Sequence, residues 1–173
     1  MATQAVEQKT NPTKTFWSPR RVARMAIFTA LAAVGAMIKI PSPTGTVALD
    51  AAPGYFSAVS FGWLEGGIVA ALGHMLTAAT TGFPLGLPIH LVVAGEQFAW
   101  AGLFWFLKEK VNIWVAIVVA TFCNGVLGAL VVIPAGGMGL YVALLPGLLV
   151  GSAINVILAA AAYLGISKSG LIK

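Results

Sequence analysis

Charged side chains are scarce in this sequence. Asp, Glu, Lys and Arg make up 9% of its 173 residues, whereas a soluble globular domain carries about 25%. Hydrophobic residues make up 59% of the chain. The deficit of charge excludes an ordinary soluble domain and predicts an integral membrane protein built from α-helices.

Several catalytic motifs are also absent. The sequence contains no G-x-x-x-x-G-K-[ST], so the chain is not expected to hydrolyse ATP itself. It contains no H-E-x-x-H and no defensible Ser/His/Asp order, and we expect neither enzyme activity nor a cofactor. The single cysteine, Cys123, cannot form an internal disulfide and is interpreted as a small packing residue.

The net charge of +5 is distributed in a way that argues against a nucleic-acid partner. Basic residues gather before the first apolar segment, between two later apolar segments and at the end of the chain, with Lys39 as the exception. If the chain crosses a lipid bilayer six times, these clusters fall on one side, as the positive-inside rule requires. The predicted outer half has no arginine, which argues against a multiply charged phosphate ligand.

Apolar runs bounded by Pro, Gly and charged residues predict a bundle of six transmembrane helices with both termini cytoplasmic. The expected spans are roughly 22–40, 50–63, 67–81, 89–107, 113–133 and 140–164. Outer loops are expected at 41–49, 82–88 and 134–139, and a tight inner turn at 65–67. The expected domains are a flexible basic cytoplasmic head (1–18), the membrane domain (19–168) and a cytoplasmic tail (169–173). We expect no signal-peptide cleavage site, because the first apolar segment is long enough to span and more spans follow.

Glu96 lies in the middle of the apolar run 89–107. A charge at the centre of a membrane costs at least about 2.5–3.5 kcal/mol, so such residues usually face a bundle interior or a cavity. On a helix, His90, Gln97 and Trp100 fall on the same face as Glu96, within an arc of about 120°. This mixture of groups suits a ligand with a flat ring and several hydrogen-bonding groups. The alternative is that Glu96 pairs with a neighbouring helix for structural reasons.

Other polar residues allow two interpretations each. Asn124 is either a ligand contact or an interhelical hydrogen bond, whereas for Asn155 we favour the interhelical role. His74 is interpreted as a packed, hydrogen-bonded residue. His74, His90 and Glu96 do not have the spacing of a metal-ligand set, so no metal site is expected.

Residues at the outer ends of the predicted spans form a second group. Lys39 and Asp50 flank the first outer loop, where they either pair with each other or contact a ligand. Tyr141 follows the third outer loop and is either an interfacial aromatic residue or a ligand contact. In the first span, Ala26 and Ala30 lie one helical turn apart, which suits tight packing in the bundle or a smooth face for another membrane protein.

These features resemble the substrate-binding S-components of energy-coupling factor (ECF) vitamin transporters. The resemblance covers about residues 20–168 and rests on the six short spans, the basic head, Ala26-x-x-x-Ala30 and the Pro/Gly-rich first outer loop. Segments 41–56 and 82–90 look most similar to the subgroup thought to take up α-ribazole, a cobalamin precursor with a dimethylbenzimidazole ring on a ribose.

The resemblance implies a high-affinity, non-enzymatic binding subunit in the bacterial cytoplasmic membrane. Such subunits associate with a module of one transmembrane coupling protein and two ATPases, and are thought to topple in the membrane with their ligand. The resemblance implies that Ala26 and Ala30 dock the coupling protein. With the residues discussed above, it predicts that the ligand contacts Lys39, Asp50, His90, Glu96, Gln97, Trp100, Asn124 and Tyr141.

Three alternatives remain open on sequence grounds. The ligand is another flat-ring vitamin, such as a thiamine precursor or riboflavin. The chain is a self-sufficient facilitator of a small solute. It is an intramembrane enzyme that uses His74, His90 and Glu96 for acid–base chemistry.

Overall fold

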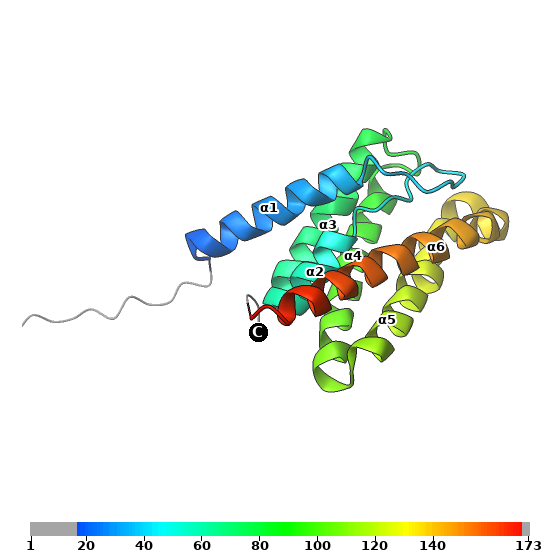
Figure 1. Ribbon diagram of the computed structural model, residues 1–173. Helices are drawn as coiled ribbons and strands as arrows, with labels where there is room; N and C mark the ends of the chain where they lie inside the picture. The colour runs from blue at the N-terminus through cyan, green and yellow to red at the C-terminus, as the bar shows by residue number, and fades with distance from the viewer. Residues whose placement is uncertain (1–16, 171–173) are drawn as a thin grey trace, which may run out of the picture.

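The computed structural model describes residues 17–170, and Figure 1 shows that this part of the chain is built from helices. The helices are α1 (Pro19–Gly35), α2 (Ala52–Phe61), α3 (Trp63–Thr80), α4 (Leu87–Lys110), α5 (Ile113–Phe122) and α6 (Ile133–Ser167). A π-helical turn, η1 (Cys123–Leu127), and a 3-10 turn, η2 (Gly128–Val132), connect α5 to α6. The predicted all-helical fold is confirmed. Almost all of the predicted head 1–18 and the end of the tail 169–173 lie outside the described residues.

Local sequence signals set two of the helix starts. Pro19 occupies the first turn of α1, where its missing N–H costs nothing, and the Ser18 hydroxyl accepts a hydrogen bond from the Arg21 N–H at 3.3 Å. At the start of α5, the Asn112 side chain accepts from the Val115 N–H at 2.9 Å.

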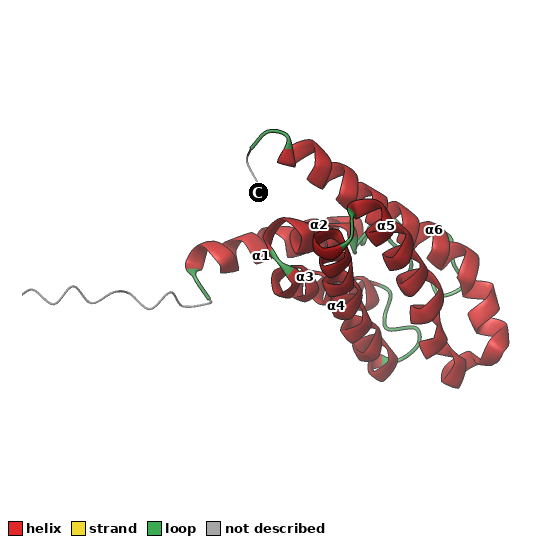
Figure 2. Ribbon diagram, turned by 90° about the horizontal axis from the view of Figure 1, so that it is seen from below, coloured by secondary structure: helices red, strands yellow, loops and turns green. Residues whose placement is uncertain are grey.

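Helix α3 is the centre of one half of the bundle, because it packs against α1, α2 and α4. Glycines permit a close approach to α2: a Cβ on Gly54 would lie 2.5 Å from the Ala70 Cβ, and a Cβ on Gly66 would lie 2.3 Å from the Ala58 Cα. Small residues at helix contacts are the expected solution in lipid, where packing replaces the hydrophobic effect. In Figure 2 this half stands beside the pair formed by α5 and α6.

The predicted inner turn at 65–67 is wrong. These residues lie in the first turn of α3, and the chain turns at Gly62, whose φ of 116° favours glycine. Gly66 and Gly67 instead serve close packing, against Ala58 and the Phe98 ring. The glycine pair was therefore a signal of helix contact and not of a turn.

The predicted outer loop at 134–139 coincides with a break within α6, because Gly137 has non-helical angles (φ 67°, ψ −173°) and separates two helical stretches. The backbone angles of Cys123, Leu127 and Gly128 are right-handed helical, so α5, η1, η2 and the start of α6 form one continuous helical stretch up to this break. Pro134 stands in the first turn of α6, where proline is well tolerated.

Two helical segments of the described chain are long and apolar enough to cross a membrane, namely Leu87–Lys110 and Ile113–Ser167. Helix α2, with 10 residues, spans only about 15 Å, half of a hydrocarbon core of about 30 Å. The six-span arrangement and the placement of both termini therefore stay predictions.

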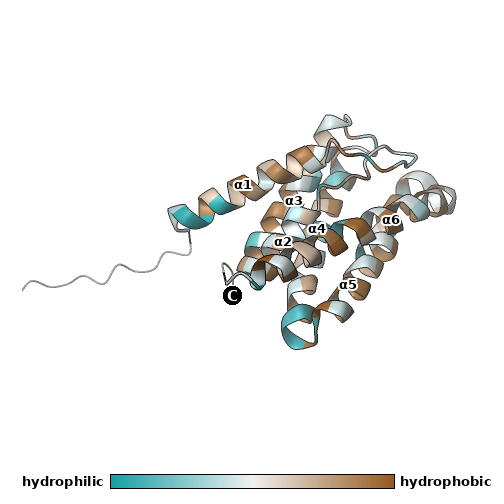
Figure 3. Cartoon of the chain, in the orientation of Figure 1, coloured by the Kyte–Doolittle hydropathy of each residue, from teal (hydrophilic) through white to brown (hydrophobic). Residues whose placement is uncertain are grey.

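The start of α1, the α4–α5 connection and the end of α6 lie at one end of the bundle (Figure 1). Figure 3 shows hydrophilic residues at the start of α1 and around the α4–α5 connection. The Lys108 ammonium lies 4.6 Å from the centre of the Tyr163 ring, which joins the ends of α4 and α6. We call this the basic end.

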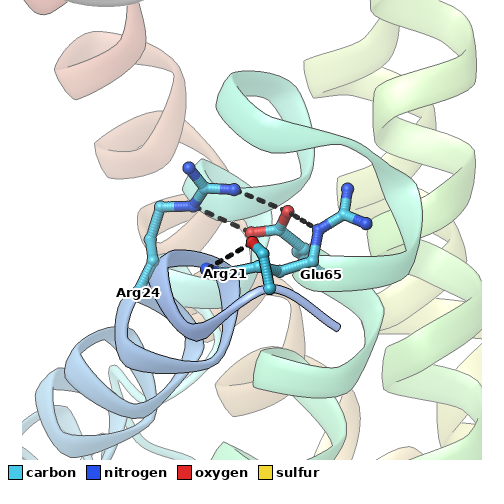
Figure 4. A network of polar contacts seen from close by, with 4 residues as sticks. Arg21, Arg24 and Glu65 are labelled. Atoms are coloured by element: carbon cyan, nitrogen blue, oxygen red, sulfur yellow. Dashed lines mark hydrogen bonds and ion pairs between the residues drawn. The ribbon is translucent and has the colours of Figure 1, made fainter. Parts of the chain in front are cut away.

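At the basic end, Glu65 connects α3 to α1 (Figure 4). Its carboxylate is 2% exposed and accepts two hydrogen bonds from Arg24, at 2.9 Å from Nε and 2.6 Å from Nη2, and a third from Arg21 Nε. The Arg24 guanidinium also lies 4.1 Å from the centre of the Phe61 ring. Charge-assisted forked contacts of this kind fix geometry as well as contributing energy, so the cluster sets the position of α1 on α3.

Glu65→Ala should destabilise the fold by roughly 1–3 kcal/mol, because it removes the shared partner of two arginines. The loss should stay below the 3–5 kcal/mol typical of a broken buried pair, since Arg21 and Arg24 are 26% and 36% exposed. Thermal unfolding in detergent measures it, with the exposed Glu109→Ala as the control. Equal unfolding temperatures for both variants and the wild type would contradict the role of the cluster.

Candidate functional site

A cavity of about 80 Å³ lies at the end of the bundle opposite the basic end. The 36–51 segment, α3, α4, the η1–η2 turns and α6 all contribute to its wall. Its polar lining residues are Thr44, Thr46, Asp50, His74, His90, Glu96, Gln97, Asn124, Ser152 and Asn155. The apolar lining includes Leu85, Val93, Val131, Val132, Leu144 and Leu148.

The segment 36–51 closes over the cavity as a short hairpin. Lys39 and Ala48 form an antiparallel bridge, and the Ile40 N–H donates to the Val47 carbonyl at 2.9 Å. The turn of the hairpin contains Gly45 at a φ of 64°. Because α1 ends at Gly35, five residues before the predicted end at Ile40, the chain has the length to fold back over the helix ends.

Four glycines of three helices lie against this hairpin, three of them against its main chain. A Cβ on Gly35 of α1 would lie 2.1 Å from the Leu49 carbonyl oxygen, and one on Gly73 of α3 would lie 2.9 Å from the Asp50 oxygen. On α6, a Cβ on Gly147 would lie 2.8 Å from the Pro41 oxygen, and one on Gly151 would lie 2.6 Å from Cγ1 of the Val47 side chain. We call this set the glycine track.

Asp50 is buried and accepts a hydrogen bond from the Thr77 hydroxyl at 2.5 Å. The sequence left open whether Asp50 pairs with Lys39. Among the ion pairs of residues 17–170 this pair does not occur, and the Lys39 side chain is exposed. Asp50 therefore fixes the end of the hairpin to α3 while lining the cavity.

His74 of α3 and His90 of α4 form a buried pair, with His74 Nε2 3.2 Å from His90 Nδ1. One nitrogen must donate and the other accept, so the two imidazoles have linked tautomers. The Phe83 ring packs against His90 with its centroid 5.7 Å away. The pair thus presents His90 Nε2 in either of two states, donor or acceptor, at the cavity wall.

Gln97 and Asn124 join α4 to the π-helical turn η1. Gln97 Nε2 donates to Asn124 Oδ1 at 2.9 Å, which is an interhelical hydrogen bond of the kind predicted as one alternative for Asn124. Asn124 also lines the cavity, so a ligand contact is compatible with this bond. Asn124 is the second residue of η1, and π-helical turns occur frequently at functional sites.

Several buried polar atoms of this region have no hydrogen-bond partner among the described residues. They are His90 Nε2, Glu96 Oε2, Gln97 Oε1, Trp100 Nε1, Thr121 Oγ1 and Ser152 Oγ. Each such group costs about 1–3 kcal/mol when it stays unsatisfied. Four of these residues, His90, Glu96, Gln97 and Ser152, line the cavity, where a polar ligand or water can supply the missing partners.

The structure brings five of the eight predicted ligand contacts to the cavity: Asp50, His90, Glu96, Gln97 and Asn124. Lys39, Trp100 and Tyr141 do not line it. Lys39 is turned outward with the hairpin, and Tyr141 is half-buried within the first turns of α6. The indole nitrogen of Trp100 lies next to the lining residue Gly128, because a Cβ on Gly128 would stand 3.4 Å from it.

Other lining residues were not predicted as contacts. Thr44, Thr46, Ser152 and Gly128 carry no distinctive spacing, and the interpretation of His74 as a packed residue did not include a place in the cavity wall. No group of His, Cys, Asp and Glu side chains within the described residues has the arrangement of a metal site.

The comparisons with known proteins agree on one family. The sequence model of the substrate-specific component of ECF transporters matches residues 20–167. The chain therefore belongs to this family, whose members bind a small-molecule substrate in a membrane and pair with an ECF module. The fold is similar to a solved S component of a bacterial ECF transporter, with a TM-score of 0.61 and 17% identity over 87% of this chain and 94% of that one. No curated protein matches the sequence.

Asn155 joins the hairpin end to α6 through three hydrogen bonds. Its Oδ1 accepts from the Ala52 N–H at 2.7 Å, and its Nδ2 donates to the carbonyls of Ala48 at 2.8 Å and Gly151 at 2.9 Å. The predicted interhelical role of Asn155 is confirmed by these contacts. Asn155 also lines the cavity, so the residue that holds the hairpin end is part of the cavity wall.

Asn155→Ala should lower the free energy of unfolding by roughly 1–3 kcal/mol, because it leaves the Ala52 N–H and the Ala48 carbonyl unpaired. Thermal unfolding in detergent checks this. Asn155→Asp keeps the acceptor for Ala52 but places a buried carboxylate oxygen against the carbonyls of Ala48 and Gly151, so it should be at least as destabilising as the alanine variant. An alanine variant as stable as the wild type would exclude the anchoring role.

Proposed function

We propose that this chain captures a neutral, flat-ring vitamin or vitamin precursor, with α-ribazole as the best candidate, for an ATP-driven ECF module. One observation carries the proposal: a polar cavity with Glu96 on its wall lies beneath a hairpin at the end opposite the basic end. Polar groups at membrane depth are expensive, and they usually mark a substrate path.

The chemistry of the lining favours a neutral ligand with hydrogen-bonding groups. Within the described residues, the lining contains two carboxylates, Asp50 and Glu96, and no lysine or arginine. An anionic phosphate would meet like charge there, whereas ribose hydroxyls find acceptors. The side chains of Val93, Leu144 and Leu148 offer aliphatic walls for the faces of a benzimidazole ring.

The size of the cavity bears on how the ligand enters. Cavities that hold drug-sized ligands measure about 300–1,000 Å³, whereas this one measures about 80 Å³. Binding of α-ribazole therefore requires the wall to move outward, and the hairpin over the glycine track is the part of the wall that lies outside the helices. In this proposal the hairpin faces the exterior of a bacterial cytoplasmic membrane and both termini face the cytoplasm.

The exposed face of α1 supports the proposed docking to the coupling protein. Ala26 and Ala30 are exposed, and so are their apolar neighbours Ile27 and Leu31. Small residues allow a second helix to approach closely. The cluster of Glu65 with two arginines holds the other face of α1 against α3, so this smooth face points away from the bundle. Docking here is compatible with the toppling of the whole bundle during transport.

Glu96→Ala should weaken the binding of α-ribazole at least roughly tenfold, about 1.4 kcal/mol. The reason is the loss of a buried acceptor at the cavity wall. Isothermal titration calorimetry on purified protein measures the affinity, and Glu109→Ala, which changes an exposed carboxylate near the basic end, is the matched control.

An unchanged affinity in the Glu96 variant would remove Glu96 from the site. If wild-type protein binds riboflavin or a thiamine precursor and not α-ribazole, the binding role stands and the choice of ligand is wrong. Downhill solute flux in liposomes without an ECF module would favour the facilitator.

Ala26→Trp and Ala30→Trp should leave α-ribazole binding intact and abolish its uptake, since an indole on this face prevents close approach of a partner helix. Uptake of labelled α-ribazole by cells that express the ECF module, with calorimetry in parallel, separates the two effects. Ala99→Trp, which changes an exposed alanine on α4, is the control. Normal uptake by both α1 variants would refute docking at this face.

A further inference from the structure

We propose that Glu96, Trp100 and Gly128 form a subsite that binds a hydroxyl group of the ligand. This inference rests on the proposed function, because it assumes that the cavity holds a small molecule. It adds the chemical class of the group that reaches this part of the wall, an alcohol, and it assigns a binding role to a glycine.

The geometry centres on Gly128, the first residue of η2. A Cβ built on Gly128 would lie 3.4 Å from Trp100 Nε1 and 3.5 Å from Glu96 Oε2. Glu96 and Trp100 are one turn apart on α4, so their side chains share a face. Both polar atoms therefore converge on the empty position beside Gly128 where another residue would carry its Cβ.

The two atoms have complementary hydrogen-bonding capacities. An ionised carboxylate only accepts, and an indole N–H only donates. Neither Glu96 Oε2 nor Trp100 Nε1 has a partner in the part of the chain that the structure describes, and both are shielded from solvent. The two groups also do not hydrogen-bond each other, so a third group is needed to satisfy both.

A hydroxyl group is the simplest group that does so, because it donates one hydrogen bond and accepts another. A ligand ammonium would donate to Glu96 and leave the indole N–H unpaired. A phosphate would accept from the indole and repel the carboxylate, and the described lining offers it no lysine or arginine. The pair therefore selects an alcohol over both charged groups.

The backbone conformation at position 128 does not require glycine, but the missing side chain leaves space beside Glu96 and Trp100. Its φ of −61° and ψ of −27° are open to any residue. The nearest atoms to an added Cβ stand at ordinary contact distances, 3.4 Å and beyond. A methyl group thus fits without a clash, and it would fill the space between the two polar atoms that a ligand hydroxyl needs.

Position 128 also borders the cavity together with Glu96, so a bound ligand can reach the subsite from the main cavity. The N–H of Gly128 donates to the Cys123 carbonyl across the wide π-helical turn. That bond holds the wall at Gly128, so ligand entry need only displace side chains and the hairpin.

The test compares α-ribazole with 5,6-dimethylbenzimidazole, which is the same base without the ribose, by calorimetry. Trp100→Phe removes the indole N–H, and Gly128→Ala fills the space. Each should weaken α-ribazole binding roughly tenfold and change binding of the free base by less than about twofold. Gly95→Ala is the control, because a Cβ there has no heavy atom within 4 Å.

Equal losses for both ligands, or no loss for either, would overturn the subsite while leaving the proposed function in place. If Gly128→Ala fails to yield a folded protein by size exclusion, Trp100→Phe decides alone. If the wild type binds neither compound, the same variants are titrated with riboflavin and with lumichrome, which lacks the ribityl hydroxyls. A wild type that binds none of the four compounds refutes the proposed function and the subsite together.

Discussion

The amide of Asn155 is the contact on which the cavity depends most. A bundle of apolar helices has few polar side chains, and here one of them bonds the main chain on both sides of a hairpin end and its own helix. Because the hairpin is held this way, Asp50 reaches Thr77, and the far ends of α3, α4 and α6 are covered. The interactions at the basic end are of another kind, since there charged groups near solvent hold α1 to α3.

In the function proposed above, the two ends of the bundle have separate tasks. Capture of a ligand needs a part that moves, and the hairpin meets the helices through backbone contacts and a few hydrogen bonds. Docking to a partner needs a part that stays in place, and α1 has a charged cluster at its start and an exposed face of small and apolar residues. Thermal unfolding, binding and uptake therefore report on different regions of the same bundle.

The helical fold could be predicted from composition, because a long apolar segment in a membrane satisfies its backbone hydrogen bonds by forming a helix. Glu96 and its neighbours were found for the same reason: charge at membrane depth needs a cavity. The error fell on a pair of glycines. Gly66 and Gly67 pack a helix contact, yet in the sequence they look like turn residues. Thr44, Gly128 and Ser152 were not found, because their place in the wall depends on contacts between distant segments.

The glycine track sets much of the path of the hairpin. Gly35, Gly73 and Gly147 face its main chain, and Gly151 faces the Val47 side chain. Side chains that project from it toward the cavity, such as Thr44 and Thr46, can thus be exchanged without rerouting the chain. Diversification of ligand preference among proteins built this way would then proceed by substitution at those two threonines, with the glycines left untouched.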